Sequence, residues 1–151
     1  MRAFRSHGSS KSAEEGELAM NPVPGSGIAV TLPPGKVVFW SALVQAAWSQ
    51  FVQLKDSQGN VVFTVQGASP DGHSPTQIGQ GFFKPSDPSG NYTLWLGVNG
   101  GGAWSQVIWG QDSLSTGGTA YLTKYVFACE DGADSDFNDT YLQMQWFEFL
   151  G

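Results

Sequence analysis

Short apolar runs that alternate with polar residues are the feature that most constrains how this 151-residue chain can fold. From Pro22 onward the runs are separated by Gly, Pro, Asn and Asp, the residues that favour turns. Alternation with a period of two is typical of strands with one buried face, and no segment has convincing helical periodicity. The segments with this pattern are 28–32, 36–44, 50–54, 61–65, 92–98, 105–109, 120–128 and 140–146.

Turn sequences connect several of these segments. Asp56 to Gly59 reads DSQG and is expected to close a hairpin, and Asn99 to Gly102 reads NGGG and is expected to form another turn. The stretch 67–90 contains four prolines and is expected to be a loop region. Regularly spaced short strands with such turns predict an all-β fold, an antiparallel β-sandwich of about eight to nine strands.

The stretch from Glu130 to Asp139, EDGADSDFND, holds five of the thirteen carboxylates of the chain and one carboxamide. Carboxylates this close repel one another unless a cation lies among them. Calcium fits better than magnesium, because calcium accepts about six to eight oxygen ligands in loose geometry. The plain alternative is a solvated acidic loop. It is disfavoured because the stretch leads directly into an apolar strand.

An EF-hand is excluded, although Asp134, Asp136 and Asn138 have the spacing of its first ligands. The position that requires glycine is Asp139, and the position that requires a bidentate Glu is Gln145. The following segment also has the period of a strand, whereas an EF-hand loop leads into a helix.

Composition excludes two classes of partner. Beyond residue 20 the chain has four Lys and no Arg, and its net charge is −6, so nucleic acid is not an expected partner. No apolar run has the length of a membrane span, so membrane insertion is not expected. The single Cys129 cannot form an internal disulfide and is predicted to be a small buried residue.

Residues 1–21 are polar and rich in Ser, Gly and Glu, which predicts a disordered arm or linker before a domain that spans 22–151. Arg2 and Arg5 are not followed by an apolar region, so this segment is not a signal peptide. The protein is expected to be made in the cytoplasm. Release or display at the cell surface by another route stays open.

Several segments together resemble one family. These are the acidic motif from Glu130 to Asp139, a Trp seven residues later, the Leu-Gly end, Thr31-Leu-Pro33, the run from Thr31 to Gln45, and the strand and turn from Gly90 to Gly100. They resemble the small bacterial calcium-dependent lectins of the LecB type, which bind fucose and mannose. The resemblance covers roughly residues 28 to 151.

The resemblance implies a β-sandwich that carries two adjacent calcium ions per site, with vicinal sugar hydroxyls as calcium ligands. The positions that match the family's calcium ligands are Glu130, Asp134, Asp136, Asn138, Asp139, the backbone oxygen of Gln45, and the terminal carboxylate of Gly151, which enters a neighbouring subunit's site. The positions that match its sugar site are Asp131, which accepts a sugar hydrogen bond, together with Ala46, Ala47, Asp134, Asp136 and Asp139. Trp48 is a further sugar-binding candidate, as an apolar wall without a counterpart in the family. A homodimer or higher homo-oligomer follows, with Phe147, Phe149 and Leu150 as its apolar surface.

The loop after Gln45 bears on the expected ligand, a mono- or oligosaccharide of the mannose or fucose type. In the family, serines in this loop accompany fucose and alanines accompany mannose, so Ala46 and Ala47 predict that mannose binds at least as well as fucose. Trp48 is expected to be exposed, whereas Trp40, Trp95 and Trp146 are expected to be structural. The chain departs from the family in having Gln45 in place of Asn and two extra residues near its end.

Two other functions compete with a lectin. One is a structural calcium-binding β-sandwich of a surface protein, without sugar binding. The other is a glycosidase, which needs a protonated carboxyl as its acid. Metal ligation would keep the carboxylates ionised, and His7 and His73 lie in polar segments without a catalytic partner, so no enzymatic activity is expected.

Overall fold

The computed structural model describes residues 27–132 and 134–150, and in these residues the chain is all-β, as predicted. It forms ten strands and one short 3-10 helix, η1. The elements are β1 Ile28–Thr31, β2 Val38–Val44, β3 Gln50–Asp56, β4 Val61–Gly67, β5 Thr76–Phe83, β6 Asn91–Val98, η1 Asn99–Gly101, β7 Ala103–Trp104, β8 Gln106–Thr116, β9 Thr119–Glu130 and β10 Thr140–Phe147.

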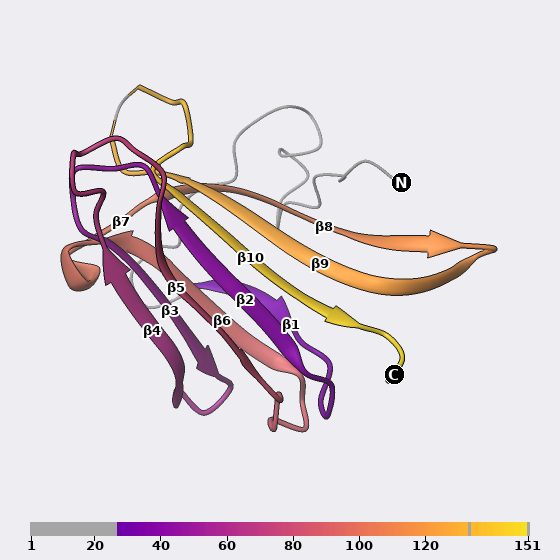
Figure 1. Cartoon of the computed structure of the whole chain (residues 1–151). Coiled ribbons are helices and arrows are strands. Elements are labelled where there is room, and N and C mark those ends of the chain that lie inside the picture. The colour runs from indigo at the N-terminus through magenta and orange to yellow at the C-terminus, as the bar shows by residue number, and fades with distance from the viewer. Residues whose placement is uncertain (1–26, 133, 151) are drawn as a thin grey trace.

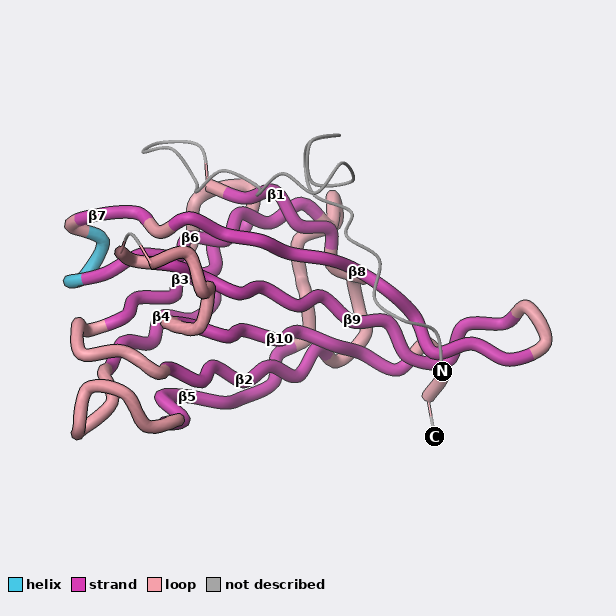
Figure 2. Tube along the Cα trace, turned by 90° about the horizontal axis from the view of Figure 1, so that it is seen from above, coloured by secondary structure: helices cyan, strands magenta, loops and turns pink. Residues whose placement is uncertain are grey.

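The strands form two antiparallel sheets that pack face to face (Figure 1). The first sheet has the order β1-β6-β3-β4, with β7 paired to β6. The second has the order β5-β2-β10-β9-β8. Strands β8 and β9 continue past β10 as a long hairpin that projects from one end of the molecule (Figure 2). The predicted antiparallel sandwich is therefore confirmed.

The core lies between the sheets and is built from the inward half of each alternating strand. Leu142 and Met144 of β10 are fully buried, as are Leu94 and Leu96 of β6. The Trp40 ring of β2 stacks on a Phe63 ring of β4 with centroids 4.0 Å apart and planes 8° apart, which joins the two sheets. Trp40 and Trp146 are buried and Trp95 is half-buried, in agreement with the structural role expected for all three. Cys129 is buried and unpaired, as predicted.

Strand register brings three loops to one end of the sandwich. In the second sheet Thr140 pairs with Cys129 on one side and with Val44 on the other, and Val44 in turn pairs with Thr76. The loop 131–139, the segment after β2 and the segment before β5 therefore share that end. Any chemistry carried by these loops is held in place by the sheet.

The structure corrects one expectation, the loop predicted at 67–90, because this stretch contains the eight-residue strand β5. Gly79 and Gly81 of β5 lie against the Trp40 indole and leave the room that its ring occupies. Glycines within a strand lower its propensity, so the local sequence favours a loop where packing on Trp40 favours a strand. Strands β8 and β9 are also longer than predicted. The hairpin turn at Asp56 is confirmed, because its Oδ1 accepts the backbone N–H groups of Gln58 and Asn60.

The predicted arm at 1–21 lies outside the described residues, so it stays a prediction. In the described part of the chain no helix has the length and apolar character needed to cross a membrane.

Adding a methyl group at Gly79 should destabilise the sandwich. A Cβ there would lie 2.7 Å from Val65 Cγ1 and 3.2 Å from the Trp40 ring, with the opposite sheet behind it. Overpacking of this kind costs about 1–3 kcal/mol, so Gly79→Ala should lower the free energy of unfolding by that amount. Gly81→Ala is the matched control, since its nearest contact is 3.2 Å, from the Trp40 ring. Denaturant unfolding would measure both, and equal stability of Gly79→Ala and the parent chain would contradict the packing argument.

Candidate functional site

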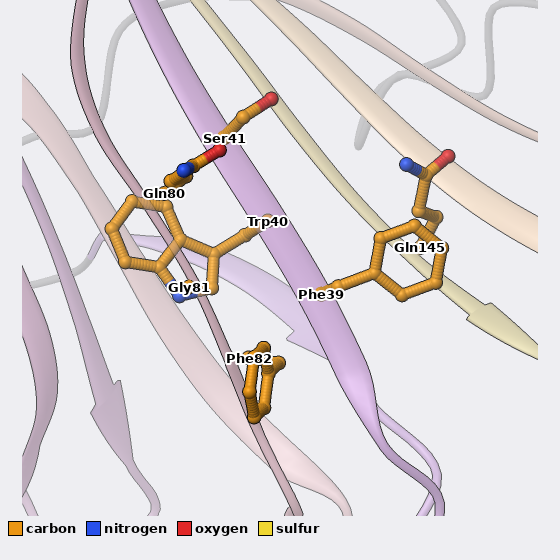
Figure 3. Close-up of a pocket in the computed structure, with 7 residues that line it drawn as sticks. All are labelled: Phe39, Trp40, Ser41, Gln80, Gly81, Phe82 and Gln145. Carbon is orange, nitrogen blue, oxygen red and sulfur yellow. The ribbon is translucent and has the colours of Figure 1, made fainter.

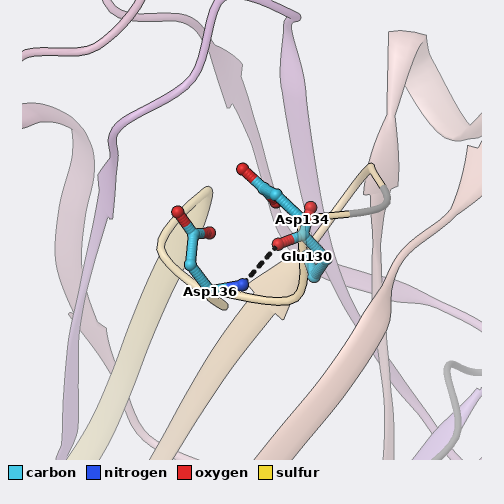
Figure 4. A group of neighbouring side chains, drawn as sticks. All are labelled: Glu130, Asp134 and Asp136. Atoms are coloured by element: carbon cyan, nitrogen blue, oxygen red, sulfur yellow. Dashed lines mark hydrogen bonds between the residues drawn. The ribbon is translucent and has the colours of Figure 1, made fainter.

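Glu130, the last residue of β9, organises the acidic loop. Glu130 is only 2% exposed, and its carboxylate accepts hydrogen bonds from backbone N–H groups of the loop that follows. Oε2 accepts the N–H of Asp136 at 3.1 Å (Figure 4). Oε2 also accepts the N–H of Phe137 at 3.3 Å, and Oε1 accepts the N–H of Gly132 at 2.7 Å. These donors compensate the cost of burying the charge and wrap the loop around it.

The loop backbone is held in an unusual conformation. Ser135 and Phe137 have φ values of 60° and 54°, in the left-handed region that L residues seldom adopt. Such residues cost roughly 1–3 kcal/mol each and persist where their surroundings fix them. Here Glu130 fixes the loop centre, and the Asp139 N–H, which donates to the Cys129 carbonyl at 3.1 Å, closes its base.

The carboxylates form two groups that share Glu130. One contains Glu130, Asp134 and Asp136, and the other contains Glu130, Asp131 and Asp139. In each group one oxygen from every residue lies within 4.8 Å of the others. A set made only of oxygen donors suits a hard divalent cation, so the residues fit calcium well. Two groups with one common member suit two cations side by side.

The pKa values show the repulsion within the loop. Burial, together with the charges of Asp131 and Glu130, raises the pKa of Asp139 to about 7. A hydrogen bond to Glu130 raises the pKa of Asp134 as well. The pKa of Glu130 is lowered, because the hydrogen bonds that it accepts outweigh its burial. A bound cation would therefore displace a proton from Asp139 below about pH 7.

Asp131 is oriented by a residue that sequence analysis did not single out. The amide nitrogen of Gln50 donates to Asp131 Oδ2 at 2.5 Å, and the amide oxygen of Gln50 accepts from Thr140 Oγ1 at 2.9 Å. Gln50 is fully buried at the start of β3. Its position on the inward face with Val52 and Leu54 was the available signal, because a polar side chain there needs a buried partner.

Two further loops complete the site. The N–H of Gln45 donates to the Asp139 carbonyl at 3.1 Å, which ties the segment after β2 to the acidic loop. The segment before β5 is in turn bonded to the segment after β2. The N–H of Ser69 donates to the Ala46 carbonyl at 2.8 Å, and Ser69 Oγ accepts the Ala46 N–H at 3.1 Å. The three loops therefore form one connected rim.

These loops surround a hollow of about 330 Å³. Its lining residues are Gln45, Ala46, Ala47, Trp48, Gly72, His73, Asp131, Asp134, Asp136, Asn138 and Asp139. Every predicted site residue in the described part of the chain lines this hollow, except Glu130. Glu130 is buried and belongs to the site as the shared member of the two groups of carboxylates. Asn138 donates its side-chain N–H to Asp136 Oδ2 at 2.8 Å, and Trp48 is 57% exposed, as expected. Gly151 lies outside the described residues.

Gly72 and His73 line this hollow although the sequence assigned them no role. The sequence predicts His73 in a polar loop without a catalytic partner. In the structure both nitrogens of its ring lie near Asp71 of the same loop. Nothing local marks these residues, since they reach the site through contacts between distant parts of the chain: the hydrogen bonds between Ser69 and Ala46, and the bond from Gln45 Nε2 to the His73 carbonyl.

Two other hollows in the described part of the chain have no comparable set of carboxylates. The larger one, of about 480 Å³, lies on the outer face of the second sheet and is lined by aromatic, amide and small side chains without a charged group (Figure 3). Another, at the far end of the sandwich, contains one carboxylate, Glu148, which pairs with Lys36 at 2.7 Å. Among the hollows found in the described residues, the one at the acidic loop is therefore the candidate site.

The metal-free protein should lose stability as the pH rises. Between about pH 4 and pH 7 folded Asp139 keeps a proton that the unfolded chain releases, so the native state binds more protons and ΔG of unfolding falls through this window. Glu148, whose pKa is lowered by Lys36, acts with the opposite sign, but its effect is complete by about pH 5. Thermal unfolding of chelator-treated protein should show a lower Tm at about pH 8 than at about pH 5.

Two controls accompany this measurement. Asp139→Asn should flatten the decline, since the titrating group is gone, and saturating divalent cation should abolish it, since the cation replaces the proton. A Tm that rises steadily with pH in the metal-free protein would contradict the assignment.

Comparison with known proteins agrees with this geometry. Thrombocorticin from Corticium sp. is 28% identical over 117 residues, which are 75% of this chain and 87% of that protein. A high-affinity mannose-binding lectin of Ralstonia solanacearum superposes with a TM-score of 0.64 at 25% identity, over 82% of this chain and 96% of that one. Lectin CV2L of Chromobacterium violaceum, solved with alpha-methyl-fucoside, has a TM-score of 0.62 at 23% identity, over 84% of this chain and all of that one, and shows the fold alone.

The family model for fucose-binding lectin II (PA-IIL) matches residues 30–148. This match spans the sandwich from β1 to the residue after β10, including the whole acidic loop. The chain therefore belongs to the fucose-binding lectin II family and is a carbohydrate-binding lectin rather than an enzyme.

Proposed function

We propose that this lectin binds mannose- and fucose-type sugars through a pair of calcium ions. The observation that carries the proposal is the two carboxylate groups that share Glu130, each with three oxygens within 4.8 Å. In this proposal the calcium ligands are Glu130, Asp134, Asp136, Asn138, Asp139, the Gln45 carbonyl, and the terminal carboxylate of another subunit.

Calcium would supply coordination positions for two adjacent hydroxyls of one sugar ring. A neutral sugar competes poorly with water for a protein surface, but the chain can offset this by fixing its ligands before the sugar arrives. The hydrogen bonds from the loop backbone to Glu130 support such preorganisation. Asp131, oriented by Gln50, would then accept a hydrogen bond from a sugar hydroxyl.

The alanines at the rim favour mannose-type ligands. Ala46 and Ala47 both line the hollow and offer no hydroxyl that could orient a deoxy sugar. Relatives of both kinds exist, since the Ralstonia lectin is described as mannose-binding and the Chromobacterium lectin was solved with a fucoside. We infer that this chain binds mannosides at least as tightly as fucosides.

Titration calorimetry with methyl mannoside and methyl fucoside tests the proposal. Both should bind in the presence of calcium and neither after exhaustive chelation, with the mannoside bound at least as tightly as the fucoside. A fucoside bound about tenfold more tightly, a difference of about 1.4 kcal/mol, would contradict the inference from the alanines. Chelation should also lower Tm, because calcium binds the native state selectively. Asp136→Ala should abolish sugar binding without unfolding the sandwich, since Asp136 is exposed. Calcium binding without any response to either sugar would instead favour a structural calcium-binding domain.

We further propose that each subunit completes the site of another. Strand β10 begins at the acidic loop and leads away from it for eight residues, a distance of roughly 25 Å, so the last residues of β10 lie far from the acidic loop of the same chain (Figure 1). Phe147, Phe149 and Leu150 are 62%, 59% and 89% exposed. An apolar surface of this kind suits a two-fold contact in which each tail reaches the other subunit.

Blocking the C-terminus should therefore weaken sugar binding. A tag added after Gly151 removes the free carboxylate, and its expected effect is a loss of at least about tenfold in affinity, whereas a tag before Met1 should leave affinity unchanged. Sedimentation analysis should show a dimer or a larger oligomer. A monomer that binds sugar at full affinity, or full affinity in the C-terminally extended chain, would refute this part of the proposal.

A further inference from the structure

Trp48 presents an unpacked indole at the rim of the sugar site. It is 57% exposed, while Trp40 and Trp146 are almost fully buried. A single exposed aromatic residue is ordinary on a protein surface. Trp48 differs in that it lines the same hollow as the acidic loop.

The backbone that carries Trp48 is fixed on both sides. The Trp48 carbonyl accepts a hydrogen bond from the Gln50 amide nitrogen at 3.2 Å, and the same nitrogen donates to Asp131 Oδ2. On the other side Ala46 is tied to Ser69 by reciprocal hydrogen bonds. An aromatic side chain with two rotatable bonds on a fixed backbone loses little conformational entropy when it packs against a ligand. The indole is therefore well placed to contribute affinity.

His73 supplies a second ring on the same rim. Its carbonyl accepts from Gln45 Nε2 at 3.4 Å, and its N–H donates to Asp71 Oδ1 at 3.1 Å, so its backbone is also anchored. Its Nδ1 lies 2.9 Å from the Asp71 carbonyl, which orients the ring, yet the side chain remains 81% exposed. Trp48 and His73 are the two residues with aromatic rings among those that line the hollow.

The contact between their two loops is close-packed. A Cβ added at Gly72 would lie 3.3 Å from Ala47 Cβ, so glycine at 72 lets the loop of His73 approach the loop of Trp48. The rim is thus formed by close packing between two loops from different parts of the chain.

We propose that Trp48 and His73 form a second subsite, which contacts the next sugar residue of an oligosaccharide whose terminal mannose-type residue is held at the acidic loop. This inference rests on the proposed function. Adjacent hydroxyls of one ring can satisfy the calcium ions, so the following residue of the glycan must leave the hollow across its rim. An indole face packs well on the C–H surface of a sugar ring, and an exposed imidazole can exchange hydrogen bonds with sugar hydroxyls. The ligand class is therefore a mannose-terminated oligosaccharide rather than a free monosaccharide.

Calorimetry of the calcium-loaded protein with methyl mannoside and with mannobiosides of different linkage tests the subsite. The parent chain should bind at least one mannobioside about tenfold more tightly than methyl mannoside. Trp48→Ala should lower the affinity for that mannobioside about tenfold more than it lowers the affinity for methyl mannoside, and Trp48→Phe should keep most of the gain. His73→Ala should remove part of the gain. Leu114→Ala, an exposed residue on the β8–β9 hairpin, is the control and should change neither affinity.

The indole N–H resonance of Trp48, assigned by its absence from the Trp48→Ala spectrum, gives a readout that does not depend on affinity. Its shift on adding the preferred mannobioside should be larger than its shift on adding methyl mannoside. Equal affinity for methyl mannoside and for every mannobioside would overturn the subsite while leaving the proposed function intact. An equal loss for both ligands in Trp48→Ala would overturn it too, because Trp48 would then contact the first residue. Failure of the parent chain to bind any of these sugars would instead refute the proposed function, and the subsite with it.

Discussion

The structure of the site depends on one buried carboxylate. Glu130 lies at the end of β9, inside the ring of like charges that the loop creates, and it is stabilised there by three backbone N–H groups. Those same hydrogen bonds hold Ser135 and Phe137 near left-handed conformations that they would otherwise avoid. One side chain thus both fixes the shape of the loop and concentrates negative charge within it. The pKa of Asp139 is raised by burial and, to a smaller extent, by the charges of Asp131 and Glu130, whereas the pKa of Asp134 is raised first by its hydrogen bond with Glu130.

The sandwich supplies the rigid frame that this arrangement requires. Strand β10 lies between β2 and β9, so the residues on either side of the acidic loop and the segment after β2 belong to one hydrogen-bonded sheet. Gln50 connects this sheet to the other, because it begins β3 in the first sheet and bonds to Thr140 of β10 and to Asp131. A shift of one sheet relative to the other would therefore move Asp131. Packing between the sheets, including the Trp40–Phe63 stack, opposes such a shift.

Much of the fold and part of the site could be predicted from the sequence. Alternation identified most strands, since burial of one face imposes a period of two, and the spacing within 130–139 brought the carboxylates together because they lie in a single tight loop. Strand β5 could not be found this way, because Gly79 and Gly81 are explained only by the Trp40 ring that packs on them. Gln50 and His73 were missed for a related reason. The inward position of Gln50 in β3 indicates a buried polar partner but not which one, because that partner, Asp131, lies 81 positions away. The contact of His73 with Gln45 spans 28 positions, and no local pattern indicates it.

The edges of the two sheets bear on how the molecule meets its own copies. Strand β8, with eleven residues, is a long edge strand of the second sheet, and a free edge of that length can accept a strand from a neighbouring molecule. Its register shifts between Leu114 and Ser115, which bends the edge, and Asp112 adds a charge to it. At the opposite edge β5 is interrupted by two glycines, and β1, an edge of the first sheet, has only four residues. Growth of a continuous intermolecular sheet is therefore opposed at the edges formed by β8, β5 and β1, so that β4, the remaining edge strand of the first sheet, is the edge better suited to pairing with another copy.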